Sequence, residues 1–529
     1  MELRERASER SESVWAAEWV RGLSRWRAWR QGLIATAFVL LVFLLFYAEE
    51  NRRGPRAWDV FRRQLEIKGV QTDWHKLAPP LVADDDNFAT TPFLAALFDF
   101  VPGTYTPRDL TAYNRAAGFA QTGPPYAEAR RSTPIVPPMV QGRRIDLGES
   151  LKLLREARQG QNAKAREPAA EIPGERSAAA VVLLGELEEF RPVLDELRSA
   201  SGRPQSRFKL NYAEGSSWAV PQPHLPVLTR VSRVLMWRGA AALETQNPQA
   251  AAEDVAFILT LAGTLRSEPF QRSVLAQTEM VDNAIQVVWE GLADHRWSAS
   301  QLSDLEGSLE KADLAEVGSR LRFDRAAGDA VFEEVHKDPG IVNGWQLGPD
   351  FGGKTRGFML RHMPRGWMFL EQITYHRLYD QLVLPAIDVE SGRMRPHLIE
   401  QANQASLSVF GHRLLASLMI GSANFLCLKA ALAQTDIRQA MLGCALERYH
   451  LANGRFPDQL NEAFPQGVPA STRDTITGQP MKYRRTAEDR FVLYSVGWDE
   501  KDDGGKVTLS SQNKAPDPST GDWVWPPYP

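Results

Sequence analysis

Eight consecutive residues match a motif that binds phosphate. Residues 348–355 read Gly-Pro-Asp-Phe-Gly-Gly-Lys-Thr and satisfy the pattern G-x-x-x-x-G-K-[ST]. In that motif a buried strand precedes the loop, and a helix follows whose first N–H groups face the phosphates. Here a loop-like run at 338–344 precedes the match and Pro364 follows soon after. The sequence therefore favours a flexible glycine-rich loop, with nucleotide binding through 348–355 as an alternative.

An acidic loop near the carboxyl terminus carries the hard oxygen ligands that calcium prefers. Its carboxylates are Asp499, Asp502, Asp503 and Asp522. The loop is not an EF-hand, because counting Asp499 as position one puts Lys501 at position three and Ser510 at position twelve, where carboxylate oxygens are needed. Two interpretations stay open, a structural calcium site and a solvated acidic loop.

The histidines and cysteines show no recognisable site. None of the nine histidines has a partner at zinc-ligand spacing, and no G-x-S-x-G nucleophile motif is present. Cys427 and Cys444 lie 17 residues apart. In one continuous helix they would be ~25 Å apart and unable to bond, whereas a reversal near 434–436 would bring them level. We expect two buried free thiols, with a disulfide as the alternative.

A membrane anchor is predicted near the amino terminus. No charged residue occurs in 31–48, which is long enough to cross a bilayer as a helix. The apolar run continues into Glu49 without a small-residue cleavage site, so we expect the anchor to stay attached. Residues 1–30 form a cytoplasmic or interfacial tail. In that tail one helical face suits the lipid interface, although a simple cytosolic stub fits equally: Trp15, Trp19, Leu23 and Trp26.

Charge does not decide the orientation of this span. Four arginines lie in the 15 residues before it and five in the 15 after it. The short tail before the span and the long chain after it favour a cytoplasmic amino terminus. We therefore predict a single-pass protein of a bacterial inner membrane, with the bulk of the chain periplasmic or otherwise extracytoplasmic.

The chain after the anchor divides into three predicted regions. Residues 49–146 form a juxtamembrane helix and a connector, because ten prolines between His75 and Ile145 forbid long helices. An apolar cluster should dock this connector on the body: Phe88, Phe93, Leu94, Leu97, Phe98 and Phe100. Residues 147–433 form a helical domain, and residues 434–529 form a small α+β module with an antiparallel sheet.

Periodicity and capping signals mark the helices of the domain at 147–433. One helix is expected over 227–245, the next begins at Asn247-Pro248, and a capping box of Ser298 with Gln301 opens another. The short turns favour antiparallel helical hairpins, either a stack like tetratricopeptide repeats or a plain bundle. The apolar run 414–428 is too short and polar for a second span, so we interpret it as a buried helix.

In the last module, a helix ending at Asn453-Gly454 precedes a β-hairpin of 481–485 with 490–496.

Four pieces resemble, in order and spacing, the globular part of type II secretion major pseudopilins: Ala445-Leu446-Glu447-Arg448-Tyr449, Asn453-Gly454-Arg455-Phe456-Pro457, Thr477-Gly478-Gln479-Pro480-Met481-Lys482-Tyr483 and Leu493-Tyr494-Ser495-Val496-Gly497-Trp498-Asp499. The resemblance covers about 436–529 and implies calcium in the loop after the last hairpin, held by the four aspartates. The family's amino-terminal methylation segment has no counterpart here. The whole chain also resembles bacterial membrane-anchored proteins of the same layout.

Composition restricts the class of function. The chain of 529 residues carries 62 basic and 65 acidic side chains, so its formal charge of −3 argues against nucleic acid as a partner. Two cysteines exclude a disulfide scaffold. We predict a membrane-anchored extracytoplasmic scaffold or binding protein, linked to secretion or cell-envelope assembly, with the bilayer and envelope proteins as partners. The alternatives are an extracytoplasmic hydrolase with its site in the helical body and a nucleotide-binding protein. No catalytic residue is nominated.

Overall fold

The computed structural model describes residues 2–120, 138–161, 171–212, 217–312, 317–344, 353–388, 390–406, 413–486, 489–510 and 515–526. Within them the chain is mainly helical, with short antiparallel strands toward the carboxyl terminus. It forms two compact units, one from Met1–Val70 and Glu334–Thr374, the other from Gln71–Glu333 and Tyr375–Pro529. The predicted fold class, mainly helical with an apolar amino-terminal helix and a small antiparallel sheet, is confirmed at this level.

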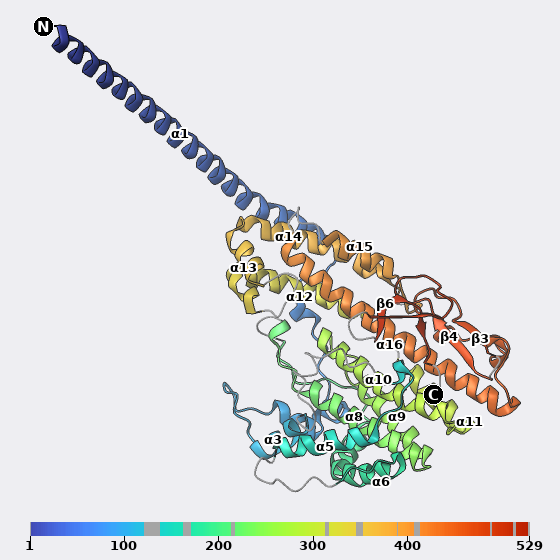
Figure 1. Cartoon of the computed structure of the whole chain (residues 1–529). Helices are drawn as coiled ribbons and strands as arrows, with labels where there is room; N and C mark the ends of the chain where they lie inside the picture. The colour runs from blue at the N-terminus through green and yellow to red at the C-terminus, as the bar shows by residue number, and fades with distance from the viewer. Residues whose placement is uncertain are drawn as a thin grey trace. The chain divides into compact units, whose positions relative to one another are not determined.

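The first unit is dominated by one long helix, α1 (Glu2–Ile67), drawn in blue in Figure 1. Its segment 31–48 exposes large apolar side chains, among them Phe38 at 65% and Leu44 at 63%. The helix is long and apolar enough to cross a membrane, and none of its most apolar stretch is buried. The side chains of Trp15, Trp19, Leu23 and Trp26 lie outside the described part of the structure.

Just after the apolar segment, α1 is attached to a second helix of the same unit. The Nε1 of Trp367 donates to Glu50 Oε2 at 2.9 Å, and the N–H of Gly366 donates to Asn51 Oδ1 at 3.0 Å. A Cβ at Gly54 would collide with the backbone of Gly366, so only glycine permits this close approach. The remaining helical elements here are α13 (Gly353–His362), the start of α14 (Arg365–Leu378), and a 3₁₀ turn at Pro339–Gly344.

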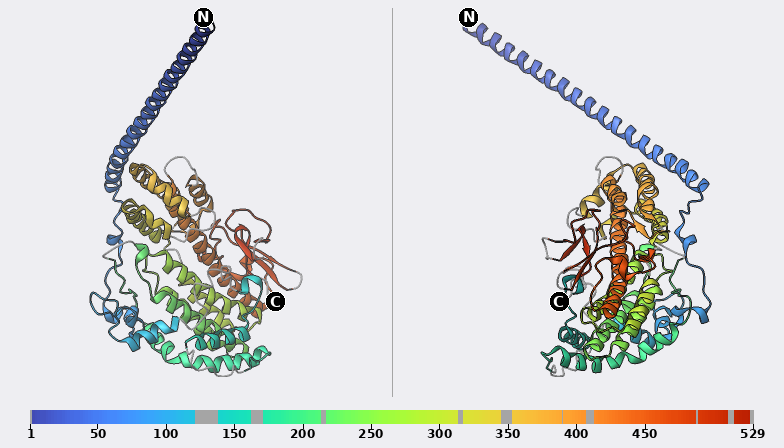
Figure 2. Two further views of the ribbon diagram at one scale, coloured as in Figure 1. Left: turned by 60° about the vertical axis from the view of Figure 1, so that its left-hand side comes forward. Right: turned by 90° about the vertical axis from the view of Figure 1, so that its right-hand side faces the viewer.

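The core of the second unit is a group of packed helices. They are α8 (His224–Glu244), α9 (Pro248–Gly263), α10 (Gln271–Ala293), α11 (Ala299–Glu310) and α16 (Leu414–Asn453). Helices α8, α9 and α10 pack on one another, and α10 and α11 pack on α16 (Figures 1 and 2). The predicted starts are confirmed, since the Asn247 side chain accepts from the Ala250 N–H and Ser298 forms its capping box with Gln301.

Other helices belong to this unit wholly or in large part. They are α2 (Pro92–Ala95), α3 (Leu110–Ala120), α5 (Leu147–Gln161), α6 (Arg176–Leu187), α7 (Arg191–Ala200), α12 (Val317–Lys337) and α15 (Pro396–Ser406). In the proline-rich connector, Phe88, Phe93, Leu94 and Leu97 are each at most 2% exposed. As predicted, these four side chains dock the connector, whereas Phe98 and Phe100 of the predicted cluster are only partly buried.

Helix α16 is continuous through 434–436, where the sequence allowed a reversal and where the predicted carboxyl-terminal module begins. By length and composition α16 also qualifies as a membrane span, but half of its apolar window is buried inside the protein, in agreement with the buried helix predicted over 414–428. Cys427 and Cys444 are buried free thiols on this one helix, so the alternative disulfide is wrong. The helix ends at Gly454 with φ 68°, the left-handed cap that glycine favours.

The strands form three small antiparallel sheets. The main one has the order β3 (Lys482–Arg485), β4 (Phe491–Ser495), β7 (Trp523–Val524), with Tyr483 opposite Leu493. The others pair β5 (Val507–Leu509) with β6 (Pro516–Gly521), and β1 (Ile387–Asp388) with β2 (Arg393–Met394). The β3–β4 hairpin confirms the prediction. The sheet is joined to α16, because Gln439 Nε2 donates to the Trp523 carbonyl at 2.7 Å.

Candidate functional site

A buried glutamate near the end of α16 is incompletely paired. The side chain of Glu447 is 1% exposed, and its Oε1 lies 2.7 Å from Nδ1 of His295. Its Oε2 is buried and has no hydrogen-bond partner. A buried carboxylate oxygen without a partner costs on the order of 1–3 kcal/mol, more if the group is charged. The site therefore retains an acceptor that the protein's own donors do not satisfy.

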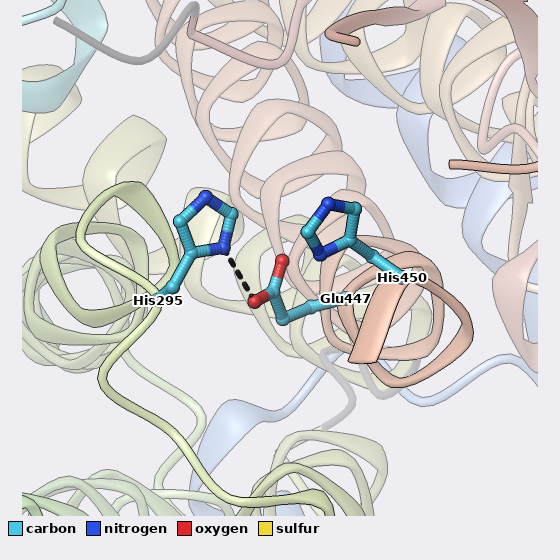
Figure 3. A group of neighbouring side chains, drawn as sticks. All are labelled: His295, Glu447 and His450. Atoms are coloured by element: carbon cyan, nitrogen blue, oxygen red, sulfur yellow. Dashed lines mark hydrogen bonds and ion pairs between the residues drawn. The ribbon is translucent and has the colours of Figure 1, made fainter. Parts of the chain in front are cut away.

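Two histidines flank this carboxylate (Figure 3). His450 lies one turn beyond Glu447 on α16, and its ring stacks on that of His295 with centroids 5.1 Å apart. One nitrogen of the His450 ring, Nδ1, is buried without a partner and turns toward the Glu447 carboxylate. Ligand atoms of the three side chains lie within 4.8 Å of one another. Among the described residues, no other group of three histidine, cysteine or carboxylate side chains converges in this way.

A turn after α10 positions His295. The helix ends at Ala293, and His295 takes a left-handed conformation with φ 49°. The Arg296 N–H closes the turn on the Gly291 carbonyl at 2.8 Å. The indole of Trp297 then folds back over Gly291, where it is 2% exposed and donates to the Val288 carbonyl at 3.1 Å. The ring that covers the glycine thus helps fix the direction in which His295 leaves α10.

A second carboxylate orients His450. Its Nε2 lies 3.2 Å from Asp489 Oδ2, at the turn of the β3–β4 hairpin. Burial alone would raise the pKa of Asp489, but hydrogen bonds from the Phe456 N–H, His450 and Arg485 outweigh it and lower the pKa. Asp489 is therefore an anion that holds one nitrogen of His450 and leaves Nδ1 facing Glu447.

Two imidazole nitrogens and one carboxylate oxygen are a ligand set for a divalent transition metal. The same three groups can also form an ion pair in which a protonated histidine neutralises Glu447. The sequence alone does not reveal this group. Glu447-x-x-His450 has the spacing that puts two ligands on one helical face, but His295 lies 152 residues from Glu447 and joins only through the packing of the chain.

The four predicted calcium ligands are arranged differently. Asp522 is 3% exposed and accepts from the backbone N–H groups of Asp503, Gly505 and Lys506. Asp499 accepts from the N–H groups of Lys501 and Gly521, and Asp502 from the Tyr494 hydroxyl and the Gly504 N–H. In the described residues no three of these carboxylates bring oxygens within 4.8 Å of one another. In the structure these aspartates stabilise the loop by accepting its hydrogen bonds, and calcium binding stays a prediction.

The phosphate-loop match falls mostly outside the described residues, which omit 345–352. The described part before it is helical, comprising α12 and the 3₁₀ turn at Pro339–Gly344, and α13 begins at Gly353. The structure thus shows a helix after the loop but, in the described residues that precede it, no strand of the kind that phosphate loops require.

Two cavities bear on the hydrolase alternative. One of about 530 Å³ is lined by Asp84, Asp109 and Lys209 among others, with no histidine, cysteine or serine in its lining. The other, of about 160 Å³, is lined by Asp324, Gln271 and Ser422, and burial raises the pKa of Asp324 to about 6. Neither brings a nucleophile and a histidine base together among its lining residues. Hydrolysis stays a prediction.

The free energy of unfolding should depend on pH because of two partly buried aspartates, one on α10 and one on α16. Burial raises the pKa of Asp282 to about 7, and burial together with Asp282 raises the pKa of Asp436 well above its usual value. A carboxyl whose pKa is raised by folding stabilises below its unfolded value and loses that contribution as pH rises through the folded value. The free energy of unfolding should therefore fall between about pH 4 and pH 7. Asp436→Asn should raise the free energy of unfolding at pH 8, because it removes a carboxyl that ionises more readily in the unfolded chain than in the folded one.

The measurement is urea unfolding of the full chain in detergent at several pH values. Asp304→Asn, at an exposed position on α11, is the control and should leave the pH profile unchanged. Equal profiles for Asp436→Asn and the unaltered chain would contradict the assignment.

A scan against protein-family models and searches of curated proteins and of solved structures found no match to this chain. The resemblance of 436–529 to major pseudopilins accordingly stays a prediction.

Proposed function

We propose that this chain is a single-pass membrane-anchored scaffold or binding protein of a bacterial cell envelope, with its body on the extracytoplasmic side of the inner membrane. The observation that carries the proposal is the exposed apolar segment 31–48 of α1. Apolar surface gains about 25 cal/mol for each Å² removed from water, so a bilayer is the environment that stabilises this segment.

The attachment of α1 to α14 supports an anchoring role. The indole of Trp367 and the N–H of Gly366 bind side chains of α1 only two and three residues beyond Ala48. The end of the span is thus held by a folded part of the chain rather than by a free linker.

The carboxyl-terminal part supports a link to secretion or envelope assembly. A long helix, α16, is followed by an antiparallel hairpin, β3–β4, as the resemblance to major pseudopilins implies. Helices α8, α9 and α10 follow one another in the chain and pack on one another, which supports a helical-hairpin body of the kind that binds other proteins. In this proposal the body holds envelope proteins near the membrane.

The first test is membrane fractionation of cells that express the full chain. We expect the protein in the membrane fraction, resistant to alkaline carbonate and released by detergent. A carboxyl-terminal alkaline phosphatase fusion should be active, because that enzyme folds outside the cytoplasm. An arginine at the centre of a span costs about 2.5–3.5 kcal/mol, so Val39→Arg with Val42→Arg should shift most of the protein out of the membrane.

The matched control is Val60→Arg with Ile67→Arg, which changes apolar residues exposed at 58% and 86% on the same helix outside the apolar segment. This pair should remain membrane-bound. Release of the unaltered chain by carbonate would overturn the anchor, and an inactive fusion on a membrane-bound chain would overturn only the sidedness.

A further inference from the structure

We propose that His295, Glu447 and His450 bind one divalent transition-metal ion, with Zn²⁺ as the first candidate. The inference goes beyond the proposed scaffold function and does not depend on it. It is carried by two buried atoms without partners, Oε2 of Glu447 and Nδ1 of His450, which face each other in one cluster. A cation between them satisfies both, which a hydrogen bond from His295 to Oε1 does not.

The distances fit an ion after a small adjustment. Zinc bonds to nitrogen and carboxylate oxygen of about 2.0–2.1 Å place tetrahedral ligand atoms about 3.3 Å apart. The ligand atoms here lie within 4.8 Å of one another, and His295 Nδ1 lies 2.7 Å from Glu447 Oε1. Binding requires both histidine rings to bring a nitrogen to bonding distance of an ion that also contacts Oε2 of Glu447.

Neighbouring groups hold the proposed metal ligands in place. Glu447 and His450 project from one rigid helix, a turn apart, and Asp489 holds Nε2 of His450. A carboxylate on the second nitrogen of a histidine fixes the ring and makes the first nitrogen a better metal ligand. His295 is 48% exposed, so an ion can enter from its side and keep a water molecule as fourth ligand.

The ligand types select among ions. Two imidazole nitrogens favour Zn²⁺, Co²⁺ or Fe²⁺, whereas Ca²⁺ requires a shell of oxygen ligands. The competing explanation is an ion pair, in which protonated His295 neutralises Glu447 without any metal. That arrangement leaves Oε2 of Glu447 and Nδ1 of His450 unpaired, and metal titration distinguishes the two explanations.

The test uses the full chain in detergent, stripped with a chelator and titrated with Zn²⁺, Co²⁺, Fe²⁺ under anaerobic conditions, or Ca²⁺. We expect one Zn²⁺ ion to bind per chain and to raise the thermal unfolding midpoint. Ca²⁺ should not bind at this site. Co²⁺ should give visible absorption bands typical of a four- or five-coordinate ion with nitrogen ligands. Tighter binding of Fe²⁺ than of Zn²⁺ would support the metal site and identify Fe²⁺ as the ion that it prefers.

Glu447→Gln removes the charged ligand but keeps the acceptor for His295, so the metal-free variant should unfold close to the unaltered chain while losing about a hundredfold in Zn²⁺ affinity. Asp489→Asn should lose about tenfold. His397→Asn is the matched control, since His397 is also 48% exposed and pairs with Glu500 at 3.0 Å outside the cluster. It should bind Zn²⁺ unchanged.

Absence of stoichiometric Zn²⁺, Co²⁺ or Fe²⁺ binding by the unaltered chain would overturn the proposal in favour of the ion pair. Equal affinity of Glu447→Gln and His397→Asn would overturn it as well, because binding would then reside elsewhere. A Glu447→Gln chain that fails to fold leaves Asp489→Asn and the Co²⁺ spectrum of the unaltered chain to decide.

Discussion

Replacing Gly291 with alanine should lower the free energy of unfolding by about 3 kcal/mol. A Cβ at this position would collide with the indole of Trp297, which is 2% exposed and holds the turn after α10. The clash is with a rigid ring rather than a flexible side chain, so either the helix or the tryptophan must move. Urea unfolding of the full chain in detergent, followed by circular dichroism, measures the change.

Gly307→Ala is the matched control, because Gly307 lies inside α11 and a Cβ there meets nothing within 4 Å. Alanine should stabilise this helix by about 0.5–1 kcal/mol through its higher helix propensity. Both variants replace glycine with alanine, but we expect Gly291→Ala to lower the free energy of unfolding and Gly307→Ala to raise it. A similar effect of both on stability would show that Trp297 does not pack on Gly291.

Asp254→Ala should lower the free energy of unfolding by about 3–5 kcal/mol. The carboxylate is 0% exposed and pairs with two arginines, Arg198 at 3.3 Å and Arg238 through its Nε at 2.7 Å. Burial by itself raises the pKa of Asp254, and the two guanidinium groups oppose that rise. Without the carboxylate, the largely buried guanidinium of Arg238 loses its counter-charge, which is more costly than losing an exposed pair.

The comparison is Glu66→Ala, which breaks the exposed pair of Glu66 with Arg62 at 3.3 Å. An exposed pair contributes about 0–1 kcal/mol, so this variant should unfold almost as the unaltered chain does. The same unfolding experiment serves both variants. A loss below about 1 kcal/mol for Asp254→Ala would mean that solvent reaches Arg238 and compensates the missing charge.

Local signals in the sequence predicted the local structure well. The Asn247-Pro248 helix start, the capping box at Ser298, and the β3–β4 hairpin each depend on residues a few positions apart, and each is confirmed. The path of α16 was harder to predict, because 434–436 is polar enough for a turn. In the structure the Thr435 hydroxyl donates to the Ala431 carbonyl at 2.8 Å, so a polar side chain is satisfied by its own helix and the helix continues.

The candidate site could not be predicted in the same way. Glu447 and His450 share a helical face that the sequence reveals, but nothing local to His295 indicates its partners. Its left-handed conformation follows from the turn closed by Arg296 and Trp297, and its contact with Glu447 follows from the packing of α10 and α11 on α16. The four aspartates form an acidic pattern in the sequence. In the fold they mainly accept hydrogen bonds from backbone N–H groups.

The continuity of α16 determines when its two cysteines can be oxidised. Cys427 and Cys444 lie ~25 Å apart along the helix, and burial raises the pKa of Cys427 to about 12 and that of Cys444 well above its usual value. Neither thiol is then reactive in the folded protein, whereas both are accessible in a chain that has not yet formed α16. If an oxidant acted before folding, a disulfide between them would prevent α16 from forming as one continuous helix. Formation of α16 therefore protects both thiols from oxidation.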